Sequence, residues 1–480
     1  MRAALIGAAR ERARSTLRDE AMALAAVGPA RYRPGMTTLN HPVRILIVGG
    51  GYVGMYSALG MQKKLSRGAA DITVVEPQSN MTYQPFLAEA AAGSVEPRHV
   101  VVPLRKVLKH CRVITGAVRA VEHERRVASV QPATGEPYEL GYDLLIVCPG
   151  SISRLLPIPG LAERGIGFKT IGEAIFLRNH MLARLDLAAS TTDPDCRRRA
   201  LTFVFVGGGY AGVEAMAELE DMARYATRYI PTIDPGDMRW VLIEAATRIM
   251  PEVSVRLSSY TVDRLTERGI DVRLETRLES AVDGRIRLSD GEEFYADTLV
   301  WTAGVKANPV LTDFGLPLDD AGRLPCAANL TVKGVNGVFA AGDCAAVPDL
   351  TKDDPNALCG PSAQHAVRQA KVLAENVASA VHGGGLRDYR HAYVGSVASL
   401  GLYRGVAEIY GIKLRGFVAW FMHRTYHVSR MPTLNRKIRV IADWTGALCF
   451  RREVVALGQI QQPRSEFEQA SGQRRLPEVS

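Results

Sequence analysis

Two glycine-rich turns are the features of this sequence best suited to chemistry. Each turn follows an apolar run, 43–48 or 201–206, and each has the spacing G-x-G-x-x-G. In such a turn the first glycine permits a tight bend, the second lets the backbone approach a pyrophosphate, and the third lets a helix pack on the strand. The phosphates then meet free N–H groups at the positive end of that helix. The glycines are Gly49, Gly51 and Gly54 in the first turn and, 158 residues later, Gly207, Gly209 and Gly212 in the second.

A carboxylate follows each turn at the distance expected of a ribose ligand. Glu76 ends the next apolar run after the first turn, and Glu244 does so after the second. An acid at this position favours a free 2′-hydroxyl over a 2′-phosphate, so the second turn predicts NADH rather than NADPH. Ala245 and Ala246 follow Glu244, and Arg248 is the nearest basic residue. Two dinucleotides in one chain suggest electron transfer between a nicotinamide and a flavin.

The elements that must position these residues follow the same order, strand, helix and strand, at two places in the chain. Strands 43–48 and 71–75 enclose a helix over 55–67, and strands 201–206 and 240–243 enclose a helix over 213–229. This order predicts an α/β fold with two Rossmann-like dinucleotide-binding domains. Three further apolar runs end on glycine, at Gly150, Gly304 and Gly342. Asp343 follows the last of them and could bind a ribityl hydroxyl, or alternatively cap a helix.

The predicted domain organisation places one dinucleotide fold inside the other. Residues 1–41 are Ala- and Arg-rich, and they are expected to be disordered or a mis-called extension. The FAD-binding domain is then expected in two segments, 42–160 and 298–385. The NADH-binding domain is expected between them, at 161–297, and a basic C-terminal membrane-association region at 386–480.

Composition excludes several classes of protein. The chain has 480 residues, of which 47% are hydrophobic and 23% charged, which is ordinary for a globular protein. Seven cysteines without a C-x-x-C pair indicate neither a disulfide scaffold nor a zinc site, so no metal is expected. No apolar run reaches the roughly 18 residues of a membrane span. The net charge of +9 is concentrated at the ends, because residues 386–480 hold 15 Lys and Arg against 7 Asp and Glu.

With these features, the chain resembles a type II NADH dehydrogenase over about residues 43–455. The resemblance rests on both glycine turns, on 301–305 (WTAGV), on 342–345 (GDCA) and on the tail. Such an enzyme is a single-chain FAD-containing NADH:quinone oxidoreductase on a membrane surface. The resemblance implies hydride transfer from NADH to FAD and then two electrons to a quinone, without proton pumping. It also implies a peripheral position at the cytoplasmic face of the cell inner membrane.

The resemblance adds residues to those that the turns supply. Segment 83–87, followed by 89–93, looks like the stretch that these enzymes place beside flavin and quinone. Glu214 matches a family glutamate near the nicotinamide, although an acid there also suits the helix dipole. The predicted FAD-binding residues are Gly49, Gly51, Tyr52, Val53, Gly54, Glu76, Gln84, Val118, Pro149, Gly150, Asp343, Ala363 and Gln364. The predicted NADH-binding residues are Gly207, Gly209, Tyr210, Gly212, Glu214, Glu244 and Gly304.

One motif departs from the family pattern. The quinone-site signature is written A-Q-x-A-x-Q, and residues 363–368 here read AQHAVR. Arg368 therefore stands where the second glutamine is expected. Gln369 follows it, but one position turns a side chain by about 100° around a helix. Glu214, Gln364 and Arg368 are the catalytic candidates, and a buried structural role for Gln364 stays open.

The basic tail contains a candidate interfacial helix over 413–431. Apolar residues gather in a broad arc, with basic residues opposite and Lys413 and Arg424 at its edge. Such a helix suits the surface of an anionic membrane, and the basic residues Arg436, Lys437, Arg439, Arg451 and Arg452 would add to the attraction. A core-packing helix or a homodimer face is the alternative. Nucleic acid is not expected, because no binding module is recognisable.

Three other functions remain open at the level of sequence. A disulfide reductase needs a cysteine pair early in the first fold, yet no cysteine precedes Cys111. A sulfide:quinone oxidoreductase could use Cys148, Cys326 and Cys344, although cysteines beside strand-end glycines are usually packing residues. A flavin-binding redox sensor with slow turnover would share the cofactor sites.

Overall fold

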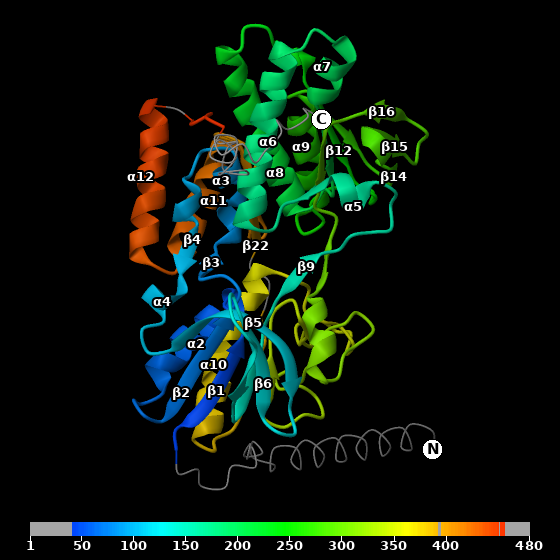
Figure 1. The fold of residues 1–480 in the computed structure, drawn as a ribbon. Coiled ribbons are helices and arrows are strands. Elements are labelled where there is room, and N and C mark those ends of the chain that lie inside the picture. Colours follow the sequence, from blue (N-terminus) through cyan, green and yellow to red (C-terminus); the bar gives the residue numbers. More distant parts are fainter. Residues whose placement is uncertain (1–40, 392–394, 451, 457–480) are drawn as a thin grey trace, which may run out of the picture. The chain divides into compact units, whose positions relative to one another are not determined.

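The computed structural model describes residues 41–391, 395–450 and 452–456 (Figure 1). The predicted extension over 1–41 lies outside them except for its last residue. The described chain forms two compact units, each assembled from three separate segments. The first unit contains the residues up to Ser79, Leu108–Gly150 and Ala307–His391. The second contains Asn80–Val107, Ser151–Lys306 and the residues after His391.

The first unit is built on a seven-stranded sheet in the order β20-β8-β1-β2-β5-β6-β7. The strands from β20 to β5 pair in parallel, whereas β5, β6 and β7 form an antiparallel meander. Apolar side chains on both faces explain why β1 and β8 lie in the centre of a covered parallel sheet. The strands are β1 (Val43–Val48), β2 (Ala70–Glu76), β5 (Arg112–Glu122), β6 (Val127–Pro132), β7 (Tyr138–Gly141), β8 (Leu144–Val147) and β20 (Val338–Ala340).

Two helices of the first unit, α2 (Tyr52–Lys64) and α10 (Ala363–Val381), pack closely against each other. A Cβ added at Gly60 of α2 would lie 2.6 Å from the Cβ of Ala374 in α10, so a small residue is required there. Ser362 caps α10 by accepting the Gln364 N–H at 3.0 Å. Because α2 follows the first glycine turn directly, this packing holds the N-termini of both helices in fixed positions.

The second unit contains a parallel five-stranded sheet in the order β10-β17-β11-β12-β13. Its core is apolar, and the rings of Phe203 and Trp240 stack at 4.5 Å. A three-stranded antiparallel sheet, β14-β15-β16, belongs to the same unit. The parallel strands are β10 (Gly165–Gly167), β11 (Thr202–Val206), β12 (Arg239–Ile243), β13 (Ile270–Arg273) and β17 (Thr298–Trp301), and the antiparallel ones are β14 (Leu278–Ser280), β15 (Arg285–Leu288) and β16 (Glu293–Tyr295).

Helices of the second unit surround this sheet. Thr170 and Glu173 form a capping box that begins α6, with reciprocal side-chain and backbone hydrogen bonds. The helices are α5 (Leu161–Arg164), α6 (Ile171–Ser190), α7 (Pro194–Ala200), α8 (Tyr210–Ala226) and α9 (Val255–Thr266). The α/β fold with a Rossmann-like sheet that the sequence predicted is therefore present.

The C-terminal segment belongs to the second unit. It contains an antiparallel sheet, β22 (Gly395–Ser399), β23 (Gly405–Ile409) and β24 (Ile412–Arg415), followed by α11 (Gly416–Arg430) and α12 (Leu434–Phe450). The early segment of the chain that joins this unit contributes β3 (Asn80–Thr82), α3 (Leu87–Ala91), β4 (Val101–Pro103) and α4 (Leu104–Val107). None of the helices in the described ranges combines the length and apolar composition needed to cross a bilayer.

Candidate functional site: two dinucleotide turns and a buried ionic cluster

The first glycine turn joins β1 to α2 with very little free space. Gly49 has φ of +105°, and a Cβ there would lie 2.4 Å from the carbonyl oxygen of Cys148. A Cβ at Gly54 would lie 1.9 Å from the oxygen of Gly49. Neither contact is tolerable, so these two glycines are required by the turn itself. Tyr52 and Val53, which the sequence also assigned to the flavin, form the first residues of α2.

Gly51 differs from its neighbours because a Cβ added there meets no atom within 4 Å. The protein itself therefore leaves the space over this residue open, at the N-terminus of α2. Such a space next to free helix N–H groups suits a pyrophosphate. The first turn thus fits a dinucleotide.

Glu76 at the end of β2 closes this turn. Its carboxylate accepts the Gly50 N–H at 2.6 Å and the Gln78 N–H at 3.1 Å. Burial raises the pKa of Glu76, and the two backbone N–H groups oppose that shift. Hydroxyl donors from a ribose would further favour its charged form.

The second turn repeats this geometry between β11 and α8. Gly207 has φ of +114°, a Cβ at Gly212 would lie 2.0 Å from the oxygen of Gly207, and the space over Gly209 is open. The carboxylate of Glu244 accepts the Gly208 N–H at 2.6 Å and the Ala246 N–H at 2.8 Å. Arg248 donates to the backbone oxygens of Pro251 and Val253. Its guanidinium is therefore already engaged by carbonyl groups.

Other strand ends of the first unit lie near the first turn. Gly342 has φ of +80°, and a Cβ there would lie 2.8 Å from the Val53 side chain in α2. Because Val53 belongs to the first glycine turn, Asp343, the next residue after Gly342, also lies close to that turn. Pro149 and Gly150 follow β8, which pairs with β1. Val118 is buried in β5, three residues beyond Thr115, the register partner of Glu76. These predicted residues therefore lie on segments at the carboxyl edge of one sheet.

Gln369 in α10 lies one position beyond the quinone motif and was not among the predicted site residues. Its side-chain oxygen accepts the Gly342 N–H at 2.7 Å, and the residue is 1% exposed. It thereby fixes the end of β20 to α10. In the sequence, Gln369 could have been noticed because it directly follows Arg368, which stands where the quinone motif has its second glutamine.

The N-terminus of α10 carries the predicted residues Ala363, Gln364 and Arg368. The Arg368 guanidinium donates to the backbone oxygen of Gln364 at 3.0 Å and lies 3.4 Å from its side-chain oxygen. Arg368 therefore folds back along its own helix and contacts Gln364, the glutamine that matches the quinone signature.

Three further predicted residues lie in the second unit, outside its glycine turn. The Gln84 side chain donates to the backbone oxygen of Lys169 at 3.3 Å. Gly304 follows β17 with φ of +90°, and a Cβ there would meet no atom within 4 Å. Glu214, the fifth residue of α8, accepts the Ser399 N–H at 2.9 Å and pairs with His423. Its carboxylate is thus already engaged in a polar network.

Comparison with known proteins decides the family. The model of the pyridine nucleotide-disulphide oxidoreductases matches residues 43–370, which is well over half of the chain. The chain belongs to this family. The resemblance drawn from the two glycine turns is confirmed.

Several relatives of this oxidoreductase are similar over most of their length. Type II NADH:quinone oxidoreductase Ndh of Mycobacterium tuberculosis is 28% identical over 417 residues, covering 84% of this chain and 87% of the relative. The external alternative NADH-ubiquinone oxidoreductase of Yarrowia lipolytica is 26% identical, covering 85% and 80%. The structure of NDH2 from Plasmodium falciparum in complex with NADH has a TM-score of 0.78 at 17% identity, covering 86% and 99%, and so shares the fold.

A buried ionic cluster in this oxidoreductase was not anticipated from its sequence. Glu89 of α3 pairs with Arg424 of α11, Nε to Oε1 at 3.2 Å, and accepts the Trp444 Nε1–H at 3.2 Å. The Arg424 guanidinium lies over the rings of Trp420 and Trp444, 4.2 and 4.6 Å from their centroids. In the sequence, the one indication of this cluster was Glu89, a single acid within the alanine-rich run 88–92.

Glu218 and Arg452 complete this cluster. Glu218 in α8 accepts the Ser399 hydroxyl at 2.8 Å and the Arg452 guanidinium at 2.8 Å. Burial would raise the pKa of Glu218, but Arg452 and Arg424 outweigh it and hold that pKa below its usual value. We therefore define the ionic cluster as Glu89, Glu214, Glu218, His423, Arg424 and Arg452.

These contacts correct the prediction for the tail. Arg424 was expected at the edge of the apolar arc, and Arg452 was expected to add to the attraction for an anionic membrane. Both are instead buried and paired with carboxylates. His423, one of the basic residues opposite the predicted apolar arc, is also buried. The expected helix begins later than predicted, because 412–415 forms β24. The periodicity of the sequence predicted an amphipathic helix. It could not show that acidic residues from other segments would form ion pairs with the basic residues of the tail. Arg451 lies outside the described residues.

Three cysteines that a sulfide:quinone oxidoreductase could have used are packed in the interior of this oxidoreductase. Cys148, Cys326 and Cys344 are free and buried. Burial raises the pKa of Cys344 to about 12 and raises those of Cys148 and Cys326 as well. A thiol that stays protonated is a poor nucleophile, which weighs against sulfide chemistry at these residues.

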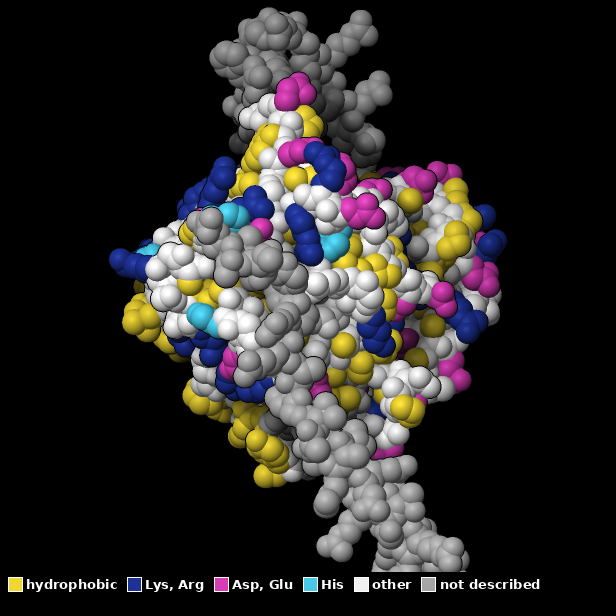
Figure 2. All heavy atoms as spheres, turned by 90° about the horizontal axis from the view of Figure 1, so that it is seen from below, with side chains coloured by type: hydrophobic (Ala, Val, Ile, Leu, Met, Phe, Trp, Pro, Cys, Tyr) yellow, Lys and Arg dark blue, Asp and Glu magenta, His cyan; other side chains and the backbone are white. Residues whose placement is uncertain are grey.

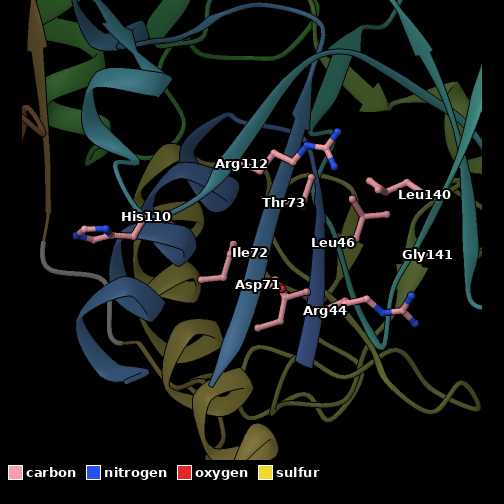
Figure 3. Close-up of a pocket in the computed structure, with 10 residues that line it drawn as sticks. Arg44, Leu46, Asp71, Ile72, Thr73, His110, Arg112, Leu140 and Gly141 are labelled. Atoms are coloured by element: carbon pink, nitrogen blue, oxygen red, sulfur yellow. The ribbon is translucent and has the colours of Figure 1, made fainter. Parts of the chain in front are cut away.

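Two cavities in this oxidoreductase lie away from its glycine turns. One, of about 350 Å³, is lined by Arg44–Leu46 of β1, 71–73 of β2, and residues including Arg112 and Leu140 (Figure 3). These are the amino-terminal ends of β1 and β2, whereas the glycine turn follows their carboxyl ends. The other, of about 500 Å³, lies beside the end of α8. Neither cavity is the dinucleotide site.

Proposed function

We propose that this chain is a FAD-dependent NADH:quinone oxidoreductase of type II, which transfers electrons to a membrane quinone without pumping protons. The observation that carries the proposal is the pair of equivalent turns, each open over its central glycine and closed by a carboxylate at a strand end. Two such turns seat two dinucleotides in one chain. The names of the two relatives given above, an NADH:quinone and an NADH-ubiquinone oxidoreductase, support the quinone as acceptor.

We assign FAD to the first unit and NADH to the second. When bound, FAD supplies the two-electron chemistry that links a hydride donor to a quinone. The chain's own groups bind and orient the cofactors: the N-terminus of α2, Glu76, and the strand ends at Gly150 and Asp343 would hold the flavin dinucleotide. The N-terminus of α8, Glu244 and Gly304 would hold NADH.

Discrimination against NADPH follows from the surroundings of Glu244. A 2′-phosphate would meet this carboxylate, and Arg248 is held by backbone oxygens. The Glu244→Arg variant should lose the preference for NADH, measured as the ratio of kcat/KM for NADH and NADPH. Because Glu244 also accepts the Gly208 N–H, Glu244→Gln is the matched control, which keeps an acceptor and removes the charge. An unchanged ratio in the Arg variant would contradict the assignment.

The acceptor site is proposed around the N-terminus of α10. Gln364 matches the quinone signature, and Arg368, held against Gln364, replaces its second glutamine. We propose that Arg368 changes which quinone the enzyme prefers but does not abolish quinone reduction. Comparing Arg368→Gln with the parent chain on menaquinone and ubiquinone tests this directly, and equal preference in both proteins would contradict it.

We further propose that the C-terminal segment attaches the enzyme to the cytoplasmic face of the cell inner membrane. Phe417, Val418 and Phe421 of α11 are each more than half exposed. Exposed apolar residues also run along α12, at Leu434, Ile438, Ile441 and Leu448. Figure 2, a view from below, shows acidic, basic and apolar side chains interspersed over the face it displays. Exposed apolar residues on two helices, one of which also carries Lys437 and Arg439, suit an anionic lipid surface.

One experiment tests the whole proposal. The protein is purified together with membranes, and its absorbance spectrum is recorded before and after NADH addition, with and without menaquinone or ubiquinone. A flavin spectrum that is bleached by NADH and restored by quinone is expected. A colourless protein would contradict the proposal, and flavin reduction without reoxidation would indicate a redox sensor instead. Size-exclusion chromatography with light scattering tests whether the chain forms a homodimer.

A further inference from the structure

The cavity of about 350 Å³ in the first unit is a space that the proposed cofactor sites do not use. Its floor belongs to β1, β2 and β5 (Figure 3). Strand register places Arg44 of β1 beside Asp71 of β2. Two positions further on, Leu46 lies beside Thr73, and Thr73 lies beside Arg112 of β5. Because side chains two positions apart on a strand share a face, all five belong to the same face of the sheet.

Strand β7 forms a wall of this cavity and is fastened to β1 by an ion pair. Arg44 donates two hydrogen bonds to the carboxylate of Asp143, from Nε to Oδ2 at 3.2 Å and from Nη2 to Oδ1 at 2.9 Å. β7 comes so close that a Cβ at Gly141 would lie 2.6 Å from Nη1 of Arg44. Its neighbour Leu140 also lines the cavity. The charge of Arg44 is therefore already balanced within the protein.

Arg112 and Asp71 are the charged groups of the cavity that have no such partner. Both residues are exposed, and in the described part of the chain neither side chain forms an ion pair or a hydrogen bond. Asp71 lies two positions before the register partner of Arg112, which separates the two levels of the sheet by about 6.6 Å. The imidazole of His110 points away from both arginines of the cavity (Figure 3). One cation and one anion thus remain for a ligand.

This arrangement fits a small molecule that carries both charges and an apolar part. A guanidinium such as that of Arg112 binds a carboxylate through two parallel hydrogen bonds. An ammonium group is the natural partner of Asp71, and Leu46 and Leu140 offer apolar surface. A ligand with a single charge would leave the other charged group of the cavity without a partner beside it. The volume lies at the lower end of the range for small-molecule sites.

We propose that this cavity binds an α-amino acid with an apolar side chain. Its carboxylate contacts Arg112, its ammonium group contacts Asp71, and its side chain lies against the leucines of floor and wall. The cavity is at the amino-terminal ends of β1 and β2, whereas the first glycine turn and Glu76 follow their carboxyl ends. The site is therefore separate from the dinucleotide sites, and the inference does not depend on the proposed function.

The test measures the binding of radiolabelled L-leucine to the full-length protein by equilibrium dialysis. Three competitors each lack one part of this probe: 4-methylpentanoate lacks the ammonium group, 3-methylbutylamine lacks the carboxylate, and glycine lacks the apolar side chain. Saturable binding of L-leucine with a Kd at or below about 1 mM is expected. Each competitor should displace it at least about tenfold less effectively than unlabelled L-leucine does.

Two variants remove the charges of the cavity one at a time. Arg112→Gln and Asp71→Asn should each weaken L-leucine binding at least about tenfold. Asp71→Asn should not weaken the binding of 4-methylpentanoate, which has no ammonium group to lose its partner. The matched control is Arg119→Gln, at an exposed arginine of β5 that does not line the cavity, and it should bind L-leucine like the parent. Flavin content and thermal unfolding of each protein confirm that it is folded.

Four results would overturn the inference. Absence of saturable L-leucine binding in the parent would show that the cavity is no amino-acid site. Equal binding of 4-methylpentanoate and L-leucine would show a site for simple anions. An equal loss in Arg119→Gln and Arg112→Gln would show nonspecific attraction to basic side chains. Displacement of L-leucine by excess NADH would assign the binding to a dinucleotide site.

Discussion

At the scale of single residues, substituting the two kinds of glycine in each turn should have different effects. A Cβ at Gly51 meets open space, whereas one at Gly54 would lie 1.9 Å from the Gly49 oxygen. We therefore expect Gly51→Ala to fold normally and to lose flavin, because its methyl group occupies the pyrophosphate space. Gly54→Ala should be destabilised by about 1–3 kcal/mol or more, because α2 must move away from β1. Flavin absorbance per protein and thermal unfolding of the flavin-free protein measure the two effects.

The second turn provides the control for this pair. Gly209→Ala should raise the KM for NADH while leaving flavin content unchanged, and Gly212→Ala should destabilise the protein as Gly54→Ala does. Loss of flavin in Gly209→Ala would contradict the assignment of the two turns to different cofactors. A fully stable Gly54→Ala would contradict the close approach of helix and strand.

At the scale of elements, Arg424 should determine how α11 packs against α3. Replacing Arg424 by Met leaves Glu89 buried without its cation, which typically costs about 3–5 kcal/mol. Burial already raises the pKa of Glu89, and Arg424 opposes that shift. In the variant this pKa should rise further, so Glu89 becomes neutral as pH falls. The loss of stability should therefore be larger at pH 8 than at pH 5.5, measured by thermal unfolding at both values.

The double variant Glu89→Gln/Arg424→Met is the matched comparison for this pH effect. A glutamine keeps an acceptor for the Trp444 Nε1–H and carries no charge. The double variant should recover some of the stability, and the difference between the two pH values should shrink. A loss that is the same at both pH values in the single variant would show that Glu89 is not the group responsible.

The sequence anticipated the elements whose signals are local. The β1 strand at 43–48, both glycine turns and the acids Glu76 and Glu244 were predicted because steric and electrostatic requirements act within a few residues there. The helices were predicted to begin at 55 and 213, whereas α2 and α8 begin at Tyr52 and Tyr210, since the turn already adopts helical geometry. The pairing of Glu89 with Arg424 could not be predicted, because nothing local indicates which distant segment will cover a helix.

At the scale of the whole molecule, membrane binding should depend on α12 rather than on the basic residues that proved to be buried. Leu434, Ile438, Ile441 and Leu448 recur at helical spacing and are exposed, and Lys437 and Arg439 lie on the same helix. Replacing Ile438, Ile441 and Leu448 by Ser should weaken binding to vesicles at least about tenfold, since each buried CH₂ contributes about 0.8 kcal/mol. Sedimentation with phosphatidylcholine vesicles containing about one-third phosphatidylglycerol measures the binding, and added salt should weaken it further.

A triple variant at exposed apolar residues of the same unit separates this effect from general hydrophobicity. Val255, Val282 and Tyr295 are also exposed, and replacing them by Ser removes a comparable apolar surface outside α12. This control should bind vesicles like the parent, with the same salt dependence. Equal weakening in both triple variants would indicate nonspecific adsorption. If the α12 variant instead kept full binding, the attachment would belong to the exposed aromatic residues of α11, and quinone reduction in vesicles would then be unaffected by changes in α12.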